Sequence, residues 1–198
     1  MSKDRLDRGV ATSHSSPLQI AAVDAPGGGV IGMTLCPGKI GPGNRHPWVR
    51  NLERDLDAMD AWGCQCLITL MELHELIDYQ VQDLGERALA RYGESGWLHL
   101  PITDCSTPNA AWEAQWQTWR SPIHDRLDRG ERVVIHCLGG LGRTGLVASR
   151  LLIERGMQPQ QALEEIRAAR PGAVETTAQE HYVRQLPCES VTRDKTNG

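Results

Sequence analysis

The sequence has no apolar run long enough to cross a bilayer, and its first 16 residues contain no apolar core of a signal peptide. It also has no excess of positive charge, since 21 lysines and arginines against 25 aspartates and glutamates give a formal net charge of −4. We therefore expect no general binding to nucleic acid or to anionic membrane surfaces. Together these absences predict a cytoplasmic protein.

The 198 residues, 40% of them hydrophobic, provide enough material for one well-cored domain. Polar, aperiodic residues 1–16 predict a flexible N-terminal tail, and residues 188–198 a C-terminal tail, which leaves a domain over residues 17–187. Six cysteines are present, but a reducing compartment makes disulfides unexpected. Cys64 and Cys66 are one residue apart in a strand-like run, so they are expected to share one face as small buried groups.

Strand-like and helical segments alternate along the chain. Five strands are predicted at residues 18–23, 30–35, 64–70, 97–102 and 133–136. Gly27, Gly28 and Gly29 connect the first two strands and precede no helix, so they predict a hairpin rather than a phosphate loop. With six or so helices, this order predicts a single α/β domain with a central five-stranded, mostly parallel sheet flanked by helices.

Caps and prolines predict where several helices begin and end. A helix with Val49, Leu52, Leu56 and Met59 on one face should end at Gly63, after a proline-punctuated loop. Residues 71–93 predict one or two helices with a charged, solvated face, interrupted near Gly85; the last two helices should run from Pro159 to Pro171 and over residues 175–186.

Three tryptophans follow a predicted helix start at Thr107 and Pro108. Trp112, Trp116 and Trp119 lie on one side of that helix, which favours core packing over ligand binding. Pro122 is expected to end or kink the helix.

The segment 133–152, VVIHCLGGLGRTGLVASRLL, joins a predicted buried strand to a predicted helix through a glycine-rich turn. In α/β sheets, ligands bind where such turns follow the carboxyl ends of strands. Between the thiol of Cys137 and the guanidinium of Arg143 lie Leu138, Gly139, Gly140, Leu141 and Gly142. The turn amides, the helix N-terminus and the guanidinium favour a nucleophilic thiolate and form a nest for a tetrahedral oxyanion such as phosphate.

The residues around this turn have predicted roles of their own. Arg143 can hold two phosphoryl oxygens in a bidentate fork, and Thr144 is expected to donate a hydrogen bond to the cysteine sulfur. His136 is expected to orient the loop through the backbone rather than to act as a base. A Gly-Lys-Ser/Thr ending is absent, so the turn is not a nucleotide-binding P-loop.

The stretch HCLGGLGRTG (136–145) resembles the His-Cys-x5-Arg-Ser/Thr signature of the cysteine-dependent protein tyrosine phosphatase superfamily. It is most similar to the dual-specificity branch, particularly the kinase-associated phosphatase (cyclin-dependent kinase inhibitor 3) family, over about residues 18–186. The resemblance implies a five-stranded sheet flanked by helices, hydrolysis of phosphoprotein monoesters through a cysteinyl-phosphate intermediate, and neither a metal nor another cofactor.

The same resemblance implies two further residues of the site. Asp104, in the stretch LPITDCSTP, matches the general-acid loop of the family, although Cys105 stands where a glycine is expected. Gln179 matches a glutamine that positions the hydrolytic water. Without the resemblance, Asp104 is compatible with a turn residue and Gln179 with a residue on a helix surface.

The absence of lysine at residues 138–142 favours a phosphoprotein over an inositol phosphate, and no basic channel for RNA is evident. The resemblance implies a dual-specificity enzyme, a possible protein kinase partner and a monomer. Three alternatives stay open: a phosphoprotein- or kinase-binding module with little turnover, a phosphatase of a non-protein monoester, and accompanying redox sensing through Cys64, Cys66 or Cys105.

Overall fold

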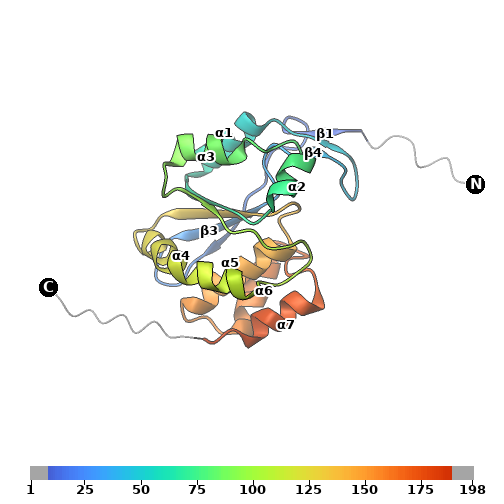
Figure 1. Cartoon of the computed structure of the whole chain (residues 1–198). Coiled ribbons are helices and arrows are strands. Elements are labelled where there is room, and N and C mark those ends of the chain that lie inside the picture. The colour runs from blue at the N-terminus through green and yellow to red at the C-terminus, as the bar shows by residue number, and fades with distance from the viewer. Residues whose placement is uncertain (1–8, 189–198) are drawn as a thin grey trace, which may run out of the picture.

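A five-stranded sheet forms the centre of the structure, a computed structural model that describes residues 9–188 (Figure 1). Its strands lie in the order β2 (Ala21–Asp24), β3 (Val30–Thr34), β8 (Arg132–His136), β6 (Cys64–Thr69) and β7 (Trp97–His99). The predicted hairpin between β2 and β3 is antiparallel, and the other neighbours are parallel. The predicted α/β fold with a mostly parallel sheet is therefore confirmed.

Helices cover both faces of this sheet. Seven helices are described within residues 9–188: α1 (Leu52–Trp62), α2 (Leu73–Asp78), α3 (Leu84–Tyr92), α4 (Ala110–Asp128), α5 (Gly142–Glu154), α6 (Pro159–Ala169) and α7 (Thr177–Gln185). In Figure 1, α1 to α3 lie above the sheet and α4 to α7 below it. Because side chains alternate along a strand, Val133 and Ile135 of β8 pack toward the lower helices and Val134 toward the upper ones.

The expectation that Cys64 and Cys66 share one face is wrong. A β-bulge between them in the pairing of β6 with β8 adds one residue to the alternation. Cys64 therefore packs with the upper hydrophobic cluster and Cys66 with the lower one. Both thiols are buried, as small apolar residues are.

A second, small sheet forms where the sequence predicts a tail and a loop. It contains β1 (Ala11–Thr12), β5 (Trp48–Val49) and β4 (Ile40–Gly41), in that order. β1 lies inside the expected tail of residues 1–16, and β4 and β5 lie where a loop and the start of a helix were expected. Residues 1–8 and 189–198 lie outside the described residues, so most of the predicted C-terminal tail is not tested.

A buried ion pair fastens the small sheet to α1. Arg50 binds Asp55 with 2.7 Å between Nε and Oδ2, and Oδ2 also accepts a hydrogen bond from the amide of Gly38 at 2.8 Å. Both charged side chains are 1% exposed. Sequence periodicity alone does not detect this contact, because Asp55 lies among charged residues that an amphipathic helix normally turns to solvent.

Two predicted helix boundaries are also corrected. The break within residues 71–93 falls between α2 and α3, whereas Gly85 lies inside α3, where an added Cβ would come within 2.5 Å of the Trp97 ring. α4 begins after Asn109, whose side chain accepts a hydrogen bond from the amide of Trp112, and it continues through Pro122. The predicted core packing of the tryptophans is confirmed, since Trp112 and Trp116 are buried and stacked.

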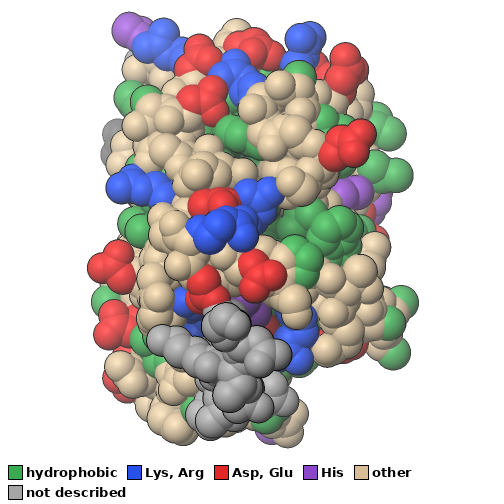
Figure 2. Space-filling view, turned by 90° about the vertical axis from the view of Figure 1, so that its left-hand side faces the viewer, with side chains coloured by type: hydrophobic (Ala, Val, Ile, Leu, Met, Phe, Trp, Pro, Cys, Tyr) green, Lys and Arg blue, Asp and Glu red, His purple; other side chains and the backbone are tan. Residues whose placement is uncertain are grey.

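Charges of both signs are interspersed on the surface shown in Figure 2. Ion pairs such as Arg91 with Glu53, at 2.6 Å, join α3 to α1. The face in view therefore offers no continuous basic track for a nucleic-acid backbone. Among residues 9–188, no helix combines the length and apolar character needed to cross a membrane.

Candidate active site

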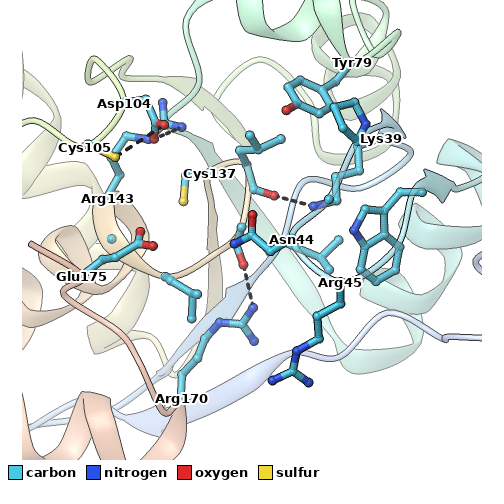
Figure 3. A pocket seen from close by; sticks show the side chains of 18 of the residues that line it. Lys39, Asn44, Arg45, Tyr79, Asp104, Cys105, Cys137, Arg143, Arg170 and Glu175 are labelled. Carbon is cyan, nitrogen blue, oxygen red and sulfur yellow. Dashed lines mark hydrogen bonds and ion pairs between the residues drawn. The ribbon is translucent and has the colours of Figure 1, made fainter. Parts of the chain in front are cut away.

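The predicted cysteine loop lies where β8 ends and α5 begins. Cys137 follows the last residue of β8 directly, is 4% exposed and lines a cavity of about 680 Å³. Figure 3 shows Cys137 between two groups of side chains, with Asp104 and Arg143 on one side and Lys39 on the other. All predicted loop residues except Gly140 line this cavity.

The carbonyl groups of the loop are held by residues outside it. Lys39 Nζ donates to the oxygen of Leu138 at 3.0 Å, and Arg170 donates to the oxygens of Gly139, at 2.9 Å, and Gly140. The Leu141 oxygen accepts from the amides of Gly145 and Val174. In a trans peptide, each following N–H points the opposite way.

The four amides that follow these carbonyls belong to residues 139–142. None of them donates to another residue in the described part of the chain. They lie in the cysteine loop and at the N-terminal end of α5, where partial positive charge accumulates. The loop therefore presents a set of unpaired donors for a tetrahedral anion, as the sequence predicts.

Gly140 is the loop residue for which no other amino acid fits. Its φ is +69°, and a Cβ added there would lie 2.2 Å from the backbone oxygen of Thr34. Close contact with β3 and the left-handed conformation both require glycine.

His136 is buried next to the loop that it is expected to orient. It is fully buried, with Nε2 2.8 Å from Thr69 Oγ1 and Nδ1 3.3 Å from the backbone oxygen of Cys137. Burial, reinforced by the charge of Arg143, lowers the pKa of His136 to about 3. With so low a pKa and with both ring nitrogens in contact with protein groups, His136 is a poor base, which agrees with the expectation that it orients the loop.

Arg143 is fixed by a residue that sequence reasoning missed. Its Nη1 and Nη2 atoms lie 2.7 and 2.8 Å from the two carboxylate oxygens of Glu75, in a bidentate pair. Burial alone lowers the pKa of a guanidinium, but the hydrogen bonds that Arg143 donates to Glu75 hold the pKa of Arg143 above its ordinary value. The Nε atom of Arg143 is buried without a partner among the described residues, so one donor stays available for an oxyanion.

Asp104 is on the cavity wall beside this arginine. Its Oδ1 atom is 2.9 Å from Arg143 Nη2, and its side chain is 60% exposed. The neighbouring Cys105 has a φ of +56°, which explains why the resemblance places a glycine there. Asp104 therefore lies at the predicted site, but in this structure it is paired with the arginine.

The structure places Gln179 in the site, but it does not form the hydrogen bond predicted for Thr144. Gln179 is fully buried and lines the cavity, so the alternative of a helix-surface residue is wrong. Its Oε1 accepts from the amides of Glu175 and Thr176, and its Nε2 donates to the oxygen of Ser106. Thr144 Oγ1 is buried without a hydrogen-bond partner among the described residues, so the predicted bond to Cys137 Sγ is not formed.

Of the cysteines considered for redox chemistry, Cys105 alone shares the cavity with Cys137. Burial raises the pKa of Cys64 and of Cys66 to about 12, and their bulge directs them into separate cores. These two thiols are poor partners for Cys137.

Solved structures with this arrangement are found among cysteine-dependent phosphatases. The chain is similar to the crystal structure of kinase associated phosphatase with its catalytic site cysteine substituted by serine, at 27% identity and a TM-score of 0.69, covering 85% of this chain and 93% of that one. It is also similar to Tk-PTP in the active form, at 31% identity and a TM-score of 0.58, covering 84% and 95%. The fold and cysteine loop thus define the dual-specificity class of protein tyrosine phosphatases.

Sequence comparison agrees with this class. Cyclin-dependent kinase inhibitor 3 of Mus musculus is 32% identical over 143 residues, which cover 69% of this chain and 64% of that protein, so the match spans less than two thirds of the relative. A probable protein tyrosine phosphatase type IVA A of Dictyostelium discoideum is 36% identical over 75 residues, 38% of this chain and 45% of that protein. The family described as PTP-SAK, Swiss Army Knife protein, DSP-PTPase phosphatase domain matches residues 49–197. The chain belongs to this family, which confirms the predicted resemblance.

Stability should depend on pH through His136. Burial lowers the pKa of the folded His136 from 6.5 to about 3, so between pH 6.5 and 5 only the unfolded state gains this proton. The free energy of unfolding should therefore fall by about 2 kcal/mol over that interval. Urea unfolding should show a smaller fall for His136→Asn, and an equal fall in both proteins would contradict the assignment.

Replacing Glu75 should destabilise the fold because Arg143 loses its buried counterion and keeps only the exposed Asp104. We expect Glu75→Gln to lower the free energy of unfolding by about 3 kcal/mol, because breaking a buried ion pair leaves an uncompensated charge. Asp78→Asn, an exposed change on the same helix, should alter it by less than about 0.5 kcal/mol. Urea denaturation measures both, and equal effects would show that Glu75 does not neutralise the arginine.

Proposed function

We propose that this chain is a phosphoprotein phosphatase that hydrolyses phosphotyrosine, phosphoserine or phosphothreonine monoesters through a cysteinyl-phosphate intermediate. The observation that carries this proposal is the geometry of the cysteine loop. Lys39 and Arg170 bind carbonyls of this loop from outside. The amides of residues 139–142 and Arg143 Nε have no hydrogen-bond acceptor among the described residues and lie beside Cys137. Membership of the dual-specificity phosphatase family supports the same chemistry.

In the first half-reaction, the thiolate of Cys137 attacks phosphorus and the bond from phosphorus to the ester oxygen breaks. The loop amides and Arg143 stabilise the equatorial oxygens. Asp104 gives its proton to the departing oxygen, which leaves as an alcohol or phenol. Since Asp104 is paired with Arg143 Nη2, the incoming phosphate takes its place on the arginine and the Asp104 side chain turns to the leaving group.

In the second half-reaction, a water molecule attacks the cysteinyl phosphate. Asp104, now a carboxylate, takes a proton from that water, and the sulfur–phosphorus bond breaks to release phosphate and the thiolate. Gln179 positions the water; its buried amide lies next to Gly142, where an added Cβ would be 2.9 Å from Gln179 Oε1. The residues named here complete the cycle with no metal or other cofactor.

The names of the relatives support the substrate class and the partner. One is a cyclin-dependent kinase inhibitor and another a kinase associated phosphatase, so a phosphorylated protein, and a protein kinase in particular, is the proposed partner. We further propose that the chain acts as a monomer in the cytoplasm, a location that agrees with its composition. The formal net charge of −4 supports a partner other than nucleic acid.

Two other functions compete with this proposal. A phosphoprotein- or kinase-binding module would bind oxyanions without releasing phosphate from p-nitrophenyl phosphate. A phosphatase of a non-protein monoester would hydrolyse that compound but not phosphopeptides. The complete set of Cys137, Arg143 and Asp104 in one cavity favours turnover over binding alone.

Substituting the nucleophile should separate catalysis from binding. Cys137→Ser should reduce hydrolysis of p-nitrophenyl phosphate by at least about 10³-fold, because the hydroxyl is a far weaker nucleophile at neutral pH. Tungstate binding, measured by calorimetry, should persist, since the loop amides and Arg143 are unchanged. Cys188→Ser, at a half-buried cysteine outside the cavity, should keep full activity. Substantial turnover by Cys137→Ser would overturn the covalent mechanism.

Substituting the acid should affect substrates according to their leaving groups. Asp104→Asn should lower kcat for a phosphoserine peptide by about 10²-fold, because an alkoxide leaves poorly without a proton. The loss on p-nitrophenyl phosphate should be much smaller, since nitrophenolate leaves unaided. Steady-state kinetics would measure both, with Asp24→Asn on the distant β2 as the control. Equal losses on the two substrates would remove Asp104 from this role.

A further inference from the structure

Part of the cavity is unused by the proposed reaction. At about 680 Å³ the cavity falls in the size range of pockets that hold whole small molecules, and a single phosphate group does not fill it. Its acidic lining residues, Asp104 and Glu175, lie on the Arg143 side of Cys137 in Figure 3. Lys39, Arg45 and Arg170 occupy the other parts of the wall.

Lys39 is a buried cation without a carboxylate partner. The residue is 5% exposed, and its Nζ atom contacts the Leu138 oxygen at 3.0 Å and the Trp48 ring, whose centroid is 5.0 Å away. No described acidic side chain pairs with it. Desolvation by burial lowers the pKa of Lys39. Burying this ammonium therefore has a desolvation cost that no described carboxylate offsets. The Leu138 oxygen, the Trp48 ring and the charge of an ionised Cys137 thiolate offset only part of it.

Arg170 is a second cation of this kind, and it contacts other carbonyls of the same loop. This half-buried guanidinium donates to the carbonyls of Gly139 and Gly140, and no described carboxylate pairs with it. Burial lowers its pKa as well. The positive charges of Lys39 and Arg170 also repel each other, which contributes to the lowered pKa of Lys39.

Three other buried arginines of the molecule are each neutralised by a carboxylate. Arg50 pairs with Asp55, Arg143 with Glu75, and Arg150 with Glu154. Lys39 and Arg170, which have no such carboxylate among the described residues, thus depart from this pattern. Charged groups that are desolvated in a cleft without a structural counterion indicate a binding site for the opposite charge.

The site is also preorganised. Lys39 precedes β4, and its backbone oxygen accepts from the amide of Arg50, whose guanidinium is locked to Asp55. Gly38, the residue before it, donates to the same carboxylate. The small sheet therefore holds Lys39 in place before any ligand arrives, which reduces the entropy cost of binding.

We propose that this part of the cavity binds a second anionic group of the substrate, next to the phosphate that is hydrolysed. Lys39 and Arg170 provide its fixed charges and Arg45, on the β4–β5 connection, provides the exposed rim. The inference rests on the proposed phosphoprotein phosphatase function. Its substrate is then a protein segment in which a second phosphorylated residue, or an acidic one, adjoins the target. The lysine-free loop alone predicts a phosphoprotein rather than an inositol phosphate and does not indicate this second anion site.

The test compares three peptides that differ at one position. Each contains the same phosphotyrosine, followed by alanine, glutamate or phosphothreonine. We expect the wild-type kcat/KM to rise in that order, by about tenfold from alanine to phosphothreonine at low salt, and the difference to shrink at 0.5 M salt because ion pairing is screened. The ratio between peptides is the readout, so a general loss of activity does not affect it.

Three variants test which residues produce the difference in kcat/KM between the peptides. Lys39→Met lowers turnover of every peptide through the loop, and in addition should reduce the phosphothreonine-to-alanine ratio to within about twofold. Arg45→Ala should reduce the ratio about threefold. Arg54→Ala, an exposed arginine on α1 outside the cavity, should keep the tenfold ratio. A purely structural role of Lys39 would lower all three peptides equally and would overturn the proposal.

The remaining outcomes separate this inference from the function on which it rests. A wild-type protein that hydrolyses all three peptides equally would overturn the second anion site and leave the phosphatase function standing. Absence of turnover on both the peptides and p-nitrophenyl phosphate would overturn the function itself. A higher kcat/KM for inositol bisphosphate than for the doubly phosphorylated peptide would overturn a phosphoprotein substrate.

Discussion

The site depends on the direction in which four peptide units of one loop point. Carbonyls from Leu138 to Leu141 are each bound by a group outside the loop, and a trans peptide then turns the following N–H groups away from those partners. If one carbonyl turned inward, it would place negative charge where an oxyanion must bind. The surrounding structure therefore serves mainly to hold backbone oxygens, and the catalytic side chains are few.

Elements from several parts of the fold together fix the position of this loop. The end of β3 lies against Gly140, Cys137 directly follows β8, and the loop leads into the N-terminal end of α5. The segment between α6 and α7 contributes Arg170 and the amide of Val174, and the small sheet contributes Lys39. The loop is thus clamped from both sides by elements far apart in sequence. Its geometry is set by tertiary structure, and the glycines only permit it.

Local patterns made the fold and the centre of the site predictable. The apolar runs of β3, β6 and β8, the glycine at the end of α1, Gly63, and the strand–turn–helix context of Cys137 are all local signals. What could not be predicted depends on contacts across the fold. Glu75 sits in a charged helical segment whose plain interpretation is a solvated face, and only packing against Arg143 buries it. The faces of Cys64 and Cys66 were wrong because a bulge leaves no mark in sequence alternation.

Lys39 and Arg170 show why a loop motif is an incomplete guide to the charge of a site. Both residues are remote from the motif in sequence, and both act on it through carbonyl oxygens that every amino acid has, so no residue type within the loop signals them. The same two contacts have opposite electrostatic consequences. Toward the loop they neutralise carbonyl dipoles and orient the amides, whereas toward the cavity they leave positive charge that no carboxylate within residues 9–188 pairs with. Positioning of the catalytic loop and selection of an anionic substrate are therefore carried by the same side chains, and a change that weakens one must weaken the other.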